Sequence, residues 1–395
     1  MQKKLLALAV AGALVPAAAF AQSSVEIYGR ANLSLGNWKA TGSTSGTGDL
    51  DSRMRVVDSG SRLGFRINES LGGGMRAFAV METGVNIDSG TSLGQHGAGN
   101  GSTGFWTSRD SYLGLGGGWG DVRLGRQSIW WSNGVIAQTG ANYIDSAADG
   151  LITGHMVAAP VTRQSSVISY NTPTMGGFNA SFSYSPHDQE PASFTGTGQE
   201  KGSIWGLTGR YTSGALRAQF DWATRKNAGN VDSRDNTGIK LGLGFAYAPG
   251  AQISGIIGQL ENENIAGFTN IGGVVGATIP GGDDVKVRFW LINWEHMFGQ
   301  MQLLAQLYKA NDVDSDALGD LDGTAVTGVT LAAKYFLSKR TGVYVSLNNV
   351  KNDDFAWADL TGGGFSSASA GGAGLGPVNA GADVRSIGIG VIHNF

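Results

Sequence analysis

The last residues of the chain alternate between two kinds of side chain. One parity is apolar apart from a single histidine: Ile387, Ile389, Val391, His393 and Phe395. The other parity is mostly small or polar. Side chains at every second position share one face of a β-strand, so this pattern predicts a strand with one apolar face. A strand whose apolar face meets lipid, ending on an aromatic ring at headgroup level, is typical of a transmembrane β-barrel. The alternative is the last strand of a soluble β-protein.

The same alternation recurs along the chain and predicts sixteen strands, the first at residues 24–35 and the last at residues 383–395. Short turns, such as residues 71–74, alternate with long polar loops, of which residues 37–51 are the first. An even number of strands lets the first and the last pair antiparallel, so that the sheet closes without an edge. Lipid requires this closure, because an unpaired backbone group there costs several kcal/mol.

We therefore predict an all-β fold: a transmembrane antiparallel β-barrel of sixteen strands, with short periplasmic turns, long extracellular loops and the third loop folded into the lumen. A soluble, secreted β-sandwich or propeller is the alternative, since such folds also alternate. The regular exchange of short turns and long loops favours the barrel. One segment, residues 285–297, departs from the pattern, because Trp290 and Trp294 lie on the parity opposite to Val287 and Phe289. A β-bulge would explain the change.

The N-terminus has the pattern of a secretory signal peptide. Lys3 and Lys4 precede an apolar run over residues 5–15, and an Ala-x-Ala site ends at Ala21. We expect residues 1–21 to be removed, which leaves residues 22–395 as a single barrel domain. The apolar run is shorter than the ~20 residues that a membrane helix needs. The chain has no cysteine, so the barrel is expected to close by backbone pairing and packing alone.

Composition narrows the function further. The chain has 64 glycines, about twice the usual ~7%, without a collagen repeat. Loss of Lys3 and Lys4 with the signal changes the formal net charge from −3 to −5, which argues against binding nucleic acid. The five histidines are scattered and none has metal-ligand spacing. We predict no metal, no cofactor and no enzymatic activity.

The polar parity of the early strands is expected to face the lumen, and it is rich in arginine: Arg30, Arg62, Arg66, Arg76, Arg109, Arg123 and Arg163. Arginine keeps its charge in a narrow, wet space. The clustering predicts a basic ladder along one wall of the lumen, while for each arginine alone a solvated position on a polar face is the alternative.

A connection of about 35 residues, at 128–162, is far longer than the usual ~4–6. It contains apolar residues such as Ile144 and Leu151, so we expect it to fold inside the barrel. Asp145 and Asp149 would then be the acidic partners of the arginines, and the opposed charges would create a field across the gap. An outer lid with incidental aspartates is the alternative.

Several motifs resemble the general porin family of Gram-negative bacteria, in particular its β-proteobacterial branch. The resemblance spans the mature chain, and seven stretches carry it: residues 25–29 (VEIYG), 61–65 (SRLGF), 71–74 (LGGG) with Glu82, 112–115 (YLGL), 124–127 (LGRQ), 335–341 (YFLSKRT) and 390–395 (GVIHNF).

The resemblance implies a sixteen-stranded barrel, a homotrimer and a third loop that forms the constriction. It assigns Arg62, Arg109 and Arg163 to a basic cluster that faces this loop. Arg30, Arg66 and Arg123 would be further basic residues of the lumen. Glu82 would neutralise part of the cluster, and Phe395 would be the signal that the barrel-assembly machinery reads.

The function expected from these patterns is an outer-membrane porin, a passive, water-filled channel for ions and small hydrophilic solutes. Outer-membrane lipid and lipopolysaccharide would surround it. The alternatives are a barrel adhesin or a lipid-modifying enzyme active at the rim. Ion preference stays open, because the lumen arginines favour anions whereas the net charge of −5 and the acidic loops favour cations. The arginines lie in the wall and the acids mostly in loops, which favours anions weakly.

Overall fold

The fold comes from a computed structural model, which describes residues 23–44, 49–88, 106–130, 154–155, 157–160, 163–186, 202–228, 233–265, 267–269, 278–358 and 379–395. Strands dominate these residues. They are β1 (Ser24–Thr41), β2 (Leu50–Asp58), β3 (Arg62–Gly72), β4 (Met75–Gly84), β5 (Ser111–Gly117), β6 (Gly120–Ser128), β7 (Gly154–His155), β8 (Val157–Ala158), β9 (Arg163–Asn171), β10 (Phe178–Ser185), β11 (Ser203–Ser213), β12 (Leu216–Lys226), β13 (Asn236–Ala248), β14 (Ala251–Asn262), β15 (Phe268–Thr269), β16 (Thr278–Ile279), β17 (Val285–Phe298), β18 (Met301–Ala310), β19 (Val313–Ser315), β20 (Gly319–Leu321), β21 (Val326–Phe336), β22 (Thr341–Asn352) and β23 (Asp383–Asn394).

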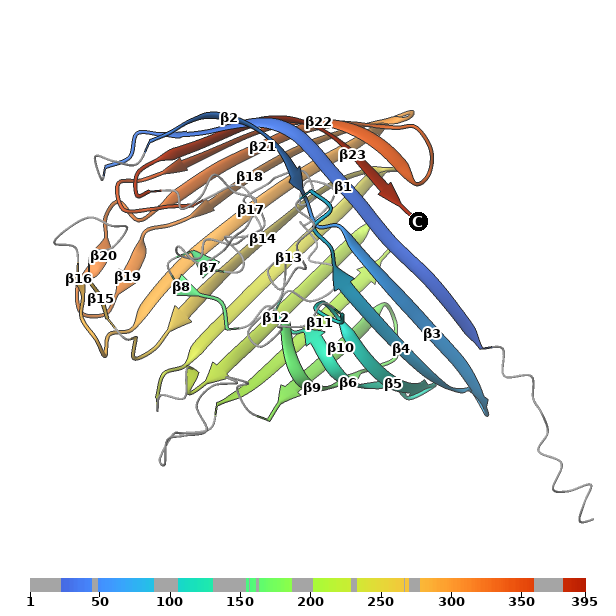
Figure 1. Cartoon of the computed structure of the whole chain (residues 1–395). Coiled ribbons are helices and arrows are strands. Elements are labelled where there is room, and N and C mark those ends of the chain that lie inside the picture. Colours follow the sequence, from blue (N-terminus) through green and yellow to red (C-terminus); the bar gives the residue numbers. More distant parts are fainter. Residues whose placement is uncertain are drawn as a thin grey trace, which may run out of the picture.

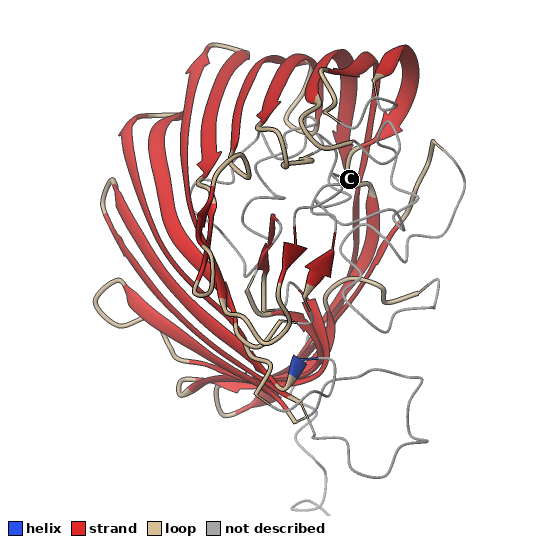
Figure 2. Cartoon of the chain, turned by 90° about the vertical axis from the view of Figure 1, so that its left-hand side faces the viewer, coloured by secondary structure: helices blue, strands red, loops and turns tan. Residues whose placement is uncertain are grey.

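The long strands form one closed antiparallel barrel (Figures 1 and 2). The last strand, β23, pairs with β1 from Asn394 opposite Arg30 to Asp383 opposite Thr41. Because β2 and β3 both pair with β1 and together form one interrupted strand, the circuit has sixteen strands. This confirms the predicted barrel. No helix in the described ranges is long and apolar enough to cross a membrane.

The prediction of a loop at residues 37–51 was wrong. Strand β1 continues to Thr41, and β2 pairs with its second half. Trp38 and Ala40 point inward and are buried, which continues the alternation through polar neighbours. The break between β2 and β3 is bridged by side chains: the Ser61 amide donates to Asp58 Oδ1 at 2.8 Å, and Ser61 Oγ accepts from the Asn32 amide at 2.9 Å.

The two faces of the barrel wall differ as the parity of the last strand predicts. Ile387, Ile389 and Val391 are 53%, 60% and 49% exposed on the outer face. The terminal Phe395 also lies outside, and its ring covers Gly29 on β1, where an added Cβ would come within 2.3 Å of the ring. The backbones of Phe395 and Gly29 exchange two hydrogen bonds, of 3.0 and 3.1 Å. The last residue therefore belongs to the seam that closes the barrel.

Many glycines of the wall lie directly opposite an aromatic residue on the neighbouring strand. The pairs on the inner face are Tyr28–Gly64, Phe78–Gly114, Phe289–Gly258, Tyr308–Gly328 and Tyr344–Gly390. At each of these glycines an added Cβ would meet the partner ring at 2.0–2.4 Å. Each ring therefore lies flat over a position that has no side chain, as in other glycine–aromatic pairs of β-sheets. This packing accounts for part of the glycine content.

The β-bulge proposed for residues 285–297 is not needed. Strand β17 pairs with β14 and β18 without a register shift. Val287, Phe289 and Leu291 are buried because they face inward against other apolar groups, while Trp290 and Ile292 face outward. The first half of β17 is thus apolar on both faces, which explains its departure from the simple alternation.

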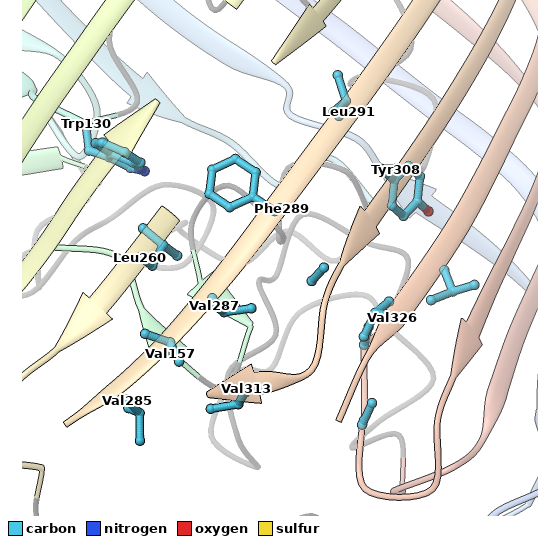
Figure 3. Packing of buried hydrophobic residues seen from close by; sticks show 14 of the residues in the cluster. Trp130, Val157, Leu260, Val285, Val287, Phe289, Leu291, Tyr308, Val313 and Val326 are labelled. Carbon is cyan, nitrogen blue, oxygen red and sulfur yellow. The ribbon is translucent and has the colours of Figure 1, made fainter. Parts of the chain in front are cut away.

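An apolar cluster fills part of the barrel interior (Figure 3). It joins inward residues of β14, β17 and β18, such as Leu260, Phe289 and Tyr308, to Trp130 and to Val157 on β8. Trp130 and Val157 belong to the long connection between β6 and β9, and both are fully buried. Both described ends of this connection therefore pack against the inner wall.

Candidate functional site

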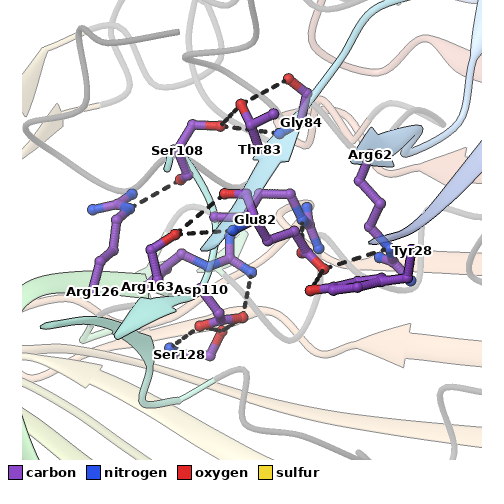
Figure 4. Close-up of polar contacts among 12 residues, drawn as sticks. Tyr28, Arg62, Glu82, Thr83, Gly84, Ser108, Asp110, Arg126, Ser128 and Arg163 are labelled. Carbon is purple, nitrogen blue, oxygen red and sulfur yellow. Dashed lines mark hydrogen bonds and ion pairs between the residues drawn. The ribbon is translucent and has the colours of Figure 1, made fainter. Parts of the chain in front are cut away.

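Four arginines and two carboxylates gather on the inner wall formed by β3, β4, β6 and β9 (Figure 4). We call this group the arginine cluster: Arg62, Arg109, Arg126, Arg163, Glu82 and Asp110. The short turn between β3 and β4 lies at the opposite end of these strands. With all six groups ionised, the cluster carries two more positive than negative charges.

Glu82 is the centre of the first half of the cluster. Its carboxylate accepts a short hydrogen bond from Arg109 Nε and lies 4.0 Å from Arg62 Nε. The Tyr28 hydroxyl donates to Glu82 Oε2 at 3.0 Å. The side chains of Arg62, Arg109 and Glu82 keep 19%, 15% and 12% of their exposure, so the group is mostly covered but reaches solvent.

Asp110 is the centre of the second half. It accepts hydrogen bonds from Arg163 Nη2 at 3.3 Å and from the amide of Ser128 at 2.6 Å. Burial opposes ionisation of Asp110, but Arg163 and Arg109 outweigh it and lower the pKa of this carboxyl below its usual value. Arg126 donates to the Ser108 carbonyl at 3.0 Å. The ion pair with Asp110 holds Arg163 against the wall.

The structure brings together four of the residues selected from the sequence, namely Arg62, Arg109, Arg163 and Glu82. The other four arginines of the predicted ladder, Arg30, Arg66, Arg76 and Arg123, lie on the same wall but outside the cluster. Three of them have a polar side-chain partner. Arg30 Nε donates to Asn394 Oδ1 at 3.0 Å, Arg66 pairs with Glu26 at 3.2 Å, and Arg123 pairs with Asp121 at 2.6 Å. Asp145 and Asp149 lie outside the described residues.

Sequence reasoning missed Asp110, Arg126 and Tyr28. Asp110 directly follows Arg109 at the start of a strand, and this neighbour was the available signal. Tyr28 lies on the same parity of β1 as Arg30, which also could have indicated an inward position. Arg126 gave no such signal, because a register shift between Gly125 and Gln127 removes it from the simple parity.

A buried lysine anchors the start of the long connection to the wall. Lys240 on β13 donates a short hydrogen bond to the Trp130 carbonyl and lies 3.8 Å from the Trp130 ring centroid. Its ammonium is 3.8 Å from Asp221, and both side chains are almost fully covered. The Trp130 ring covers Gly238, where a Cβ would come within 2.8 Å of it. Within the described residues, no group of three or more His, Asp or Glu could hold a metal ion.

Comparison with known proteins identifies the family. The family model for Gram-negative porins matches residues 7–354. Outer membrane porin protein 32 of Delftia acidovorans is 30% identical over 412 residues, which cover 100% of both chains. Major outer membrane protein P.IB of Neisseria meningitidis serogroup B is 27% identical over 351 residues, which cover 88% of this chain and 92% of the relative.

Solved structures agree with this result. The anion-selective porin from Comamonas acidovorans has a TM-score of 0.67 at 25% identity, covering 94% of this chain and 100% of that one. The trimer form of OmpT from Vibrio cholerae has a TM-score of 0.63 at 13% identity, covering 94% and 99%, and this likeness concerns the fold alone. The relatives from Delftia acidovorans and Comamonas acidovorans are named as porins, which are not enzymes. The chain belongs to the Gram-negative porin family and is a porin of the outer membrane.

Proposed function

We propose that this porin is a passive, water-filled channel for small hydrophilic solutes and ions, and that it favours anions. The observation that carries the preference is the arginine cluster, in which four guanidinium groups face only two carboxylates on the lumen wall. A surplus of one sign in a narrow gap raises the local concentration of the opposite ion. The relative from Comamonas acidovorans is itself described as anion-selective.

The arginine cluster is also the proposed basic side of the constriction. Trp130 and Val157, near the two ends of the 128–162 connection, pack against the inner wall, which supports an inward course for this third loop. Asp145 and Asp149 are the proposed acidic residues opposite the cluster. Glu82, together with Asp110, reduces the positive charge of the cluster without cancelling it.

Conductance in a planar lipid bilayer tests the channel. Purified protein is expected to increase the current in discrete steps. In a salt gradient, the sign of the reversal potential is expected to show that anions permeate more readily than cations. A folded protein that never conducts would contradict the channel. A reversal potential on the cation side would contradict only the anion preference.

The proposal also covers export and assembly of the protein. Residues 1–21 are the proposed signal peptide, and the barrel domain of residues 22–395 would assemble as a homotrimer surrounded by lipid and lipopolysaccharide. An OmpT structure is described as a trimer form, which supports the stoichiometry at the level of the fold. Phe395 is the proposed signal for the barrel-assembly machinery, and its position in the closing seam supports this role.

Replacing Phe395 with alanine is expected to lower the amount of assembled barrel in the outer membrane, because the ring that covers Gly29 is lost. Fractionation of cells followed by quantification of the folded protein measures the effect. Phe298→Ala, which removes a similarly exposed ring from the turn end of β17, is the matched control. Equal assembly of Phe395→Ala and the unaltered protein would exclude the terminal ring as a signal.

A further inference from the structure

Three arginines of the inner wall lie on aromatic rings, between the arginine cluster and the short turns. Arg66 lies 3.7 Å above the Tyr28 ring centroid, Arg76 lies 4.6 Å from Phe78, and Arg123 lies 5.1 Å from Tyr112. Along β3, Arg66 follows Arg62 by four residues on the same face. The rings and cations therefore continue the basic wall away from the cluster, along the strands toward the short turns.

The rings that carry these cations are fixed in position. The Tyr28 ring covers Gly64, and its hydroxyl bonds to Glu82. The Phe78 ring covers Gly114 and meets Tyr112 edge to face, with the ring centroids 6.3 Å apart at 85°. A fixed platform restricts the guanidinium groups above it, so little side-chain entropy is left to lose when a solute binds.

Two of the three guanidinium groups also reach the lumen. The side chain of Arg66 is 53% exposed, and Arg76 is exposed, whereas Arg123 is only 22% exposed and is engaged by Asp121. The Glu26 carboxylate occupies one edge of Arg66, at 3.2 Å. An edge contact leaves the face opposite Tyr28 open to water. Such a face is planar, positive and weakly hydrated, and aromatic rings stack on it.

We propose that Arg66 and Arg76, held on Tyr28 and Phe78, form a weak binding track for planar aromatic anions, with aromatic carboxylates as the class that it fits. The ring of the solute stacks on one guanidinium group, and its carboxylate meets a neighbouring arginine. Aliphatic anions of equal charge and size gain only the charge contact. This inference rests on the proposed channel function and adds a solute preference to it. The stacking gain is small, which a channel requires, because a solute has to leave as well as enter.

Permeation of benzoate and cyclohexanecarboxylate tests the track, because these ions match in charge and nearly in size but differ in aromaticity. Their permeability ratio is measured from reversal potentials in a planar bilayer, with each ion opposite chloride. An exposed cation–π contact is worth ~0.5–1 kcal/mol, so benzoate is expected to be favoured about two- to fivefold. Arg66→Gln and Arg76→Gln are each expected to lower the ratio, and the double variant to bring it to about one.

Arg53→Gln is the matched control. Arg53 lies on the inward parity of β2, opposite Trp38 of β1 in the strand register. Among the described residues, no aromatic ring makes a cation–π contact with its guanidinium group. This variant removes one lumen charge and is expected to keep the preference for benzoate. A ratio of about one in the unaltered protein would overturn the proposal, as would a ratio that Arg66→Gln and Arg76→Gln leave unchanged. Complete absence of current would refute the channel itself and this inference with it.

Discussion

Replacing Arg62, Arg109 and Arg163 together with glutamine is expected to change the channel from anion-preferring to cation-preferring. The arginine cluster holds four guanidinium groups and two carboxylates. The triple variant leaves Arg126 against Glu82 and Asp110, so the net charge of the cluster changes sign. Because water screens charges poorly where side chains are mostly buried, the change in sign of the net charge of the cluster is expected to dominate the local electrostatic potential. In a tenfold salt gradient, where ideal selectivity corresponds to about 59 mV, the reversal potential is expected to cross zero.

A matched control separates local from global charge in this experiment. Lys339, Arg340 and Lys351 are exposed and lie outside the arginine cluster, and their triple replacement by glutamine makes the same change in net charge. This control is expected to keep the anion preference. Arg62→Gln alone, which leaves the Arg109–Glu82 pair intact, is expected to shift the potential part of the way. Retention of full anion preference by the cluster variant would refute the role of the cluster.

Replacing Gly328 with alanine is expected to prevent most of the protein from folding. An added Cβ would lie 2.0 Å from the ring of Tyr308 on the adjacent strand. Tyr308 is fully buried in the apolar cluster, so its ring has no free space to move into. Overpacking of this kind costs roughly 1–3 kcal/mol or more. The folded fraction after dilution into lipid vesicles, followed by tryptophan fluorescence, measures the loss.

Two further variants test the cause. At Gly209 the nearest ring atom would be 3.7 Å from an added Cβ, which is an ordinary contact. Gly209→Ala is therefore expected to fold normally. Tyr308→Ala combined with Gly328→Ala removes the clash and is expected to recover folding relative to Gly328→Ala alone. If Gly328→Ala folds as well as Gly209→Ala, the glycine–aromatic pair has no role in assembly.

Most of the barrel could be predicted from the sequence, because apolar and polar residues alternate along each strand when its two faces meet different surroundings. Ile387, Ile389 and Val391, which are exposed on the outer face, show this alternation clearly. The prediction failed where the outer face leaves the apolar belt. Lys39 and Thr41 made the end of β1 look like a loop, although Trp38 and Ala40 continued the inward parity. A polar rim and a loop have similar compositions, and only the pairing with β2 separates them.

Long-range contacts explain the remaining differences. The inward face of β17 is apolar because Trp130 and Val157, which are distant in sequence, pack against it inside the barrel. The local sequence of β17 does not show which distant segment it contacts. In the candidate site, the parity of Arg62 was sufficient to place it. Arg126 lies at a register shift, where the alternation of residues no longer predicts which face a side chain points to. Register shifts are found in β6 and in the pairs β1–β2, β3–β4 and β13–β14, and not in β17, where the sequence suggested one.

The position of the apolar cluster has an electrical consequence for the lumen. Around the barrel, the arginine cluster occupies the second to sixth strands, and the apolar residues of β14, β17 and β18 occupy the eleventh to thirteenth, half a circuit away. Hydrocarbon polarises far less than water, so the lumen is bounded opposite the arginines by a medium of low dielectric constant. Field lines from the surplus positive charge are then confined to the remaining water. In the proposed anion-preferring channel, these charges would therefore attract a passing anion over a longer stretch of its path than they would in a fully hydrated cylinder.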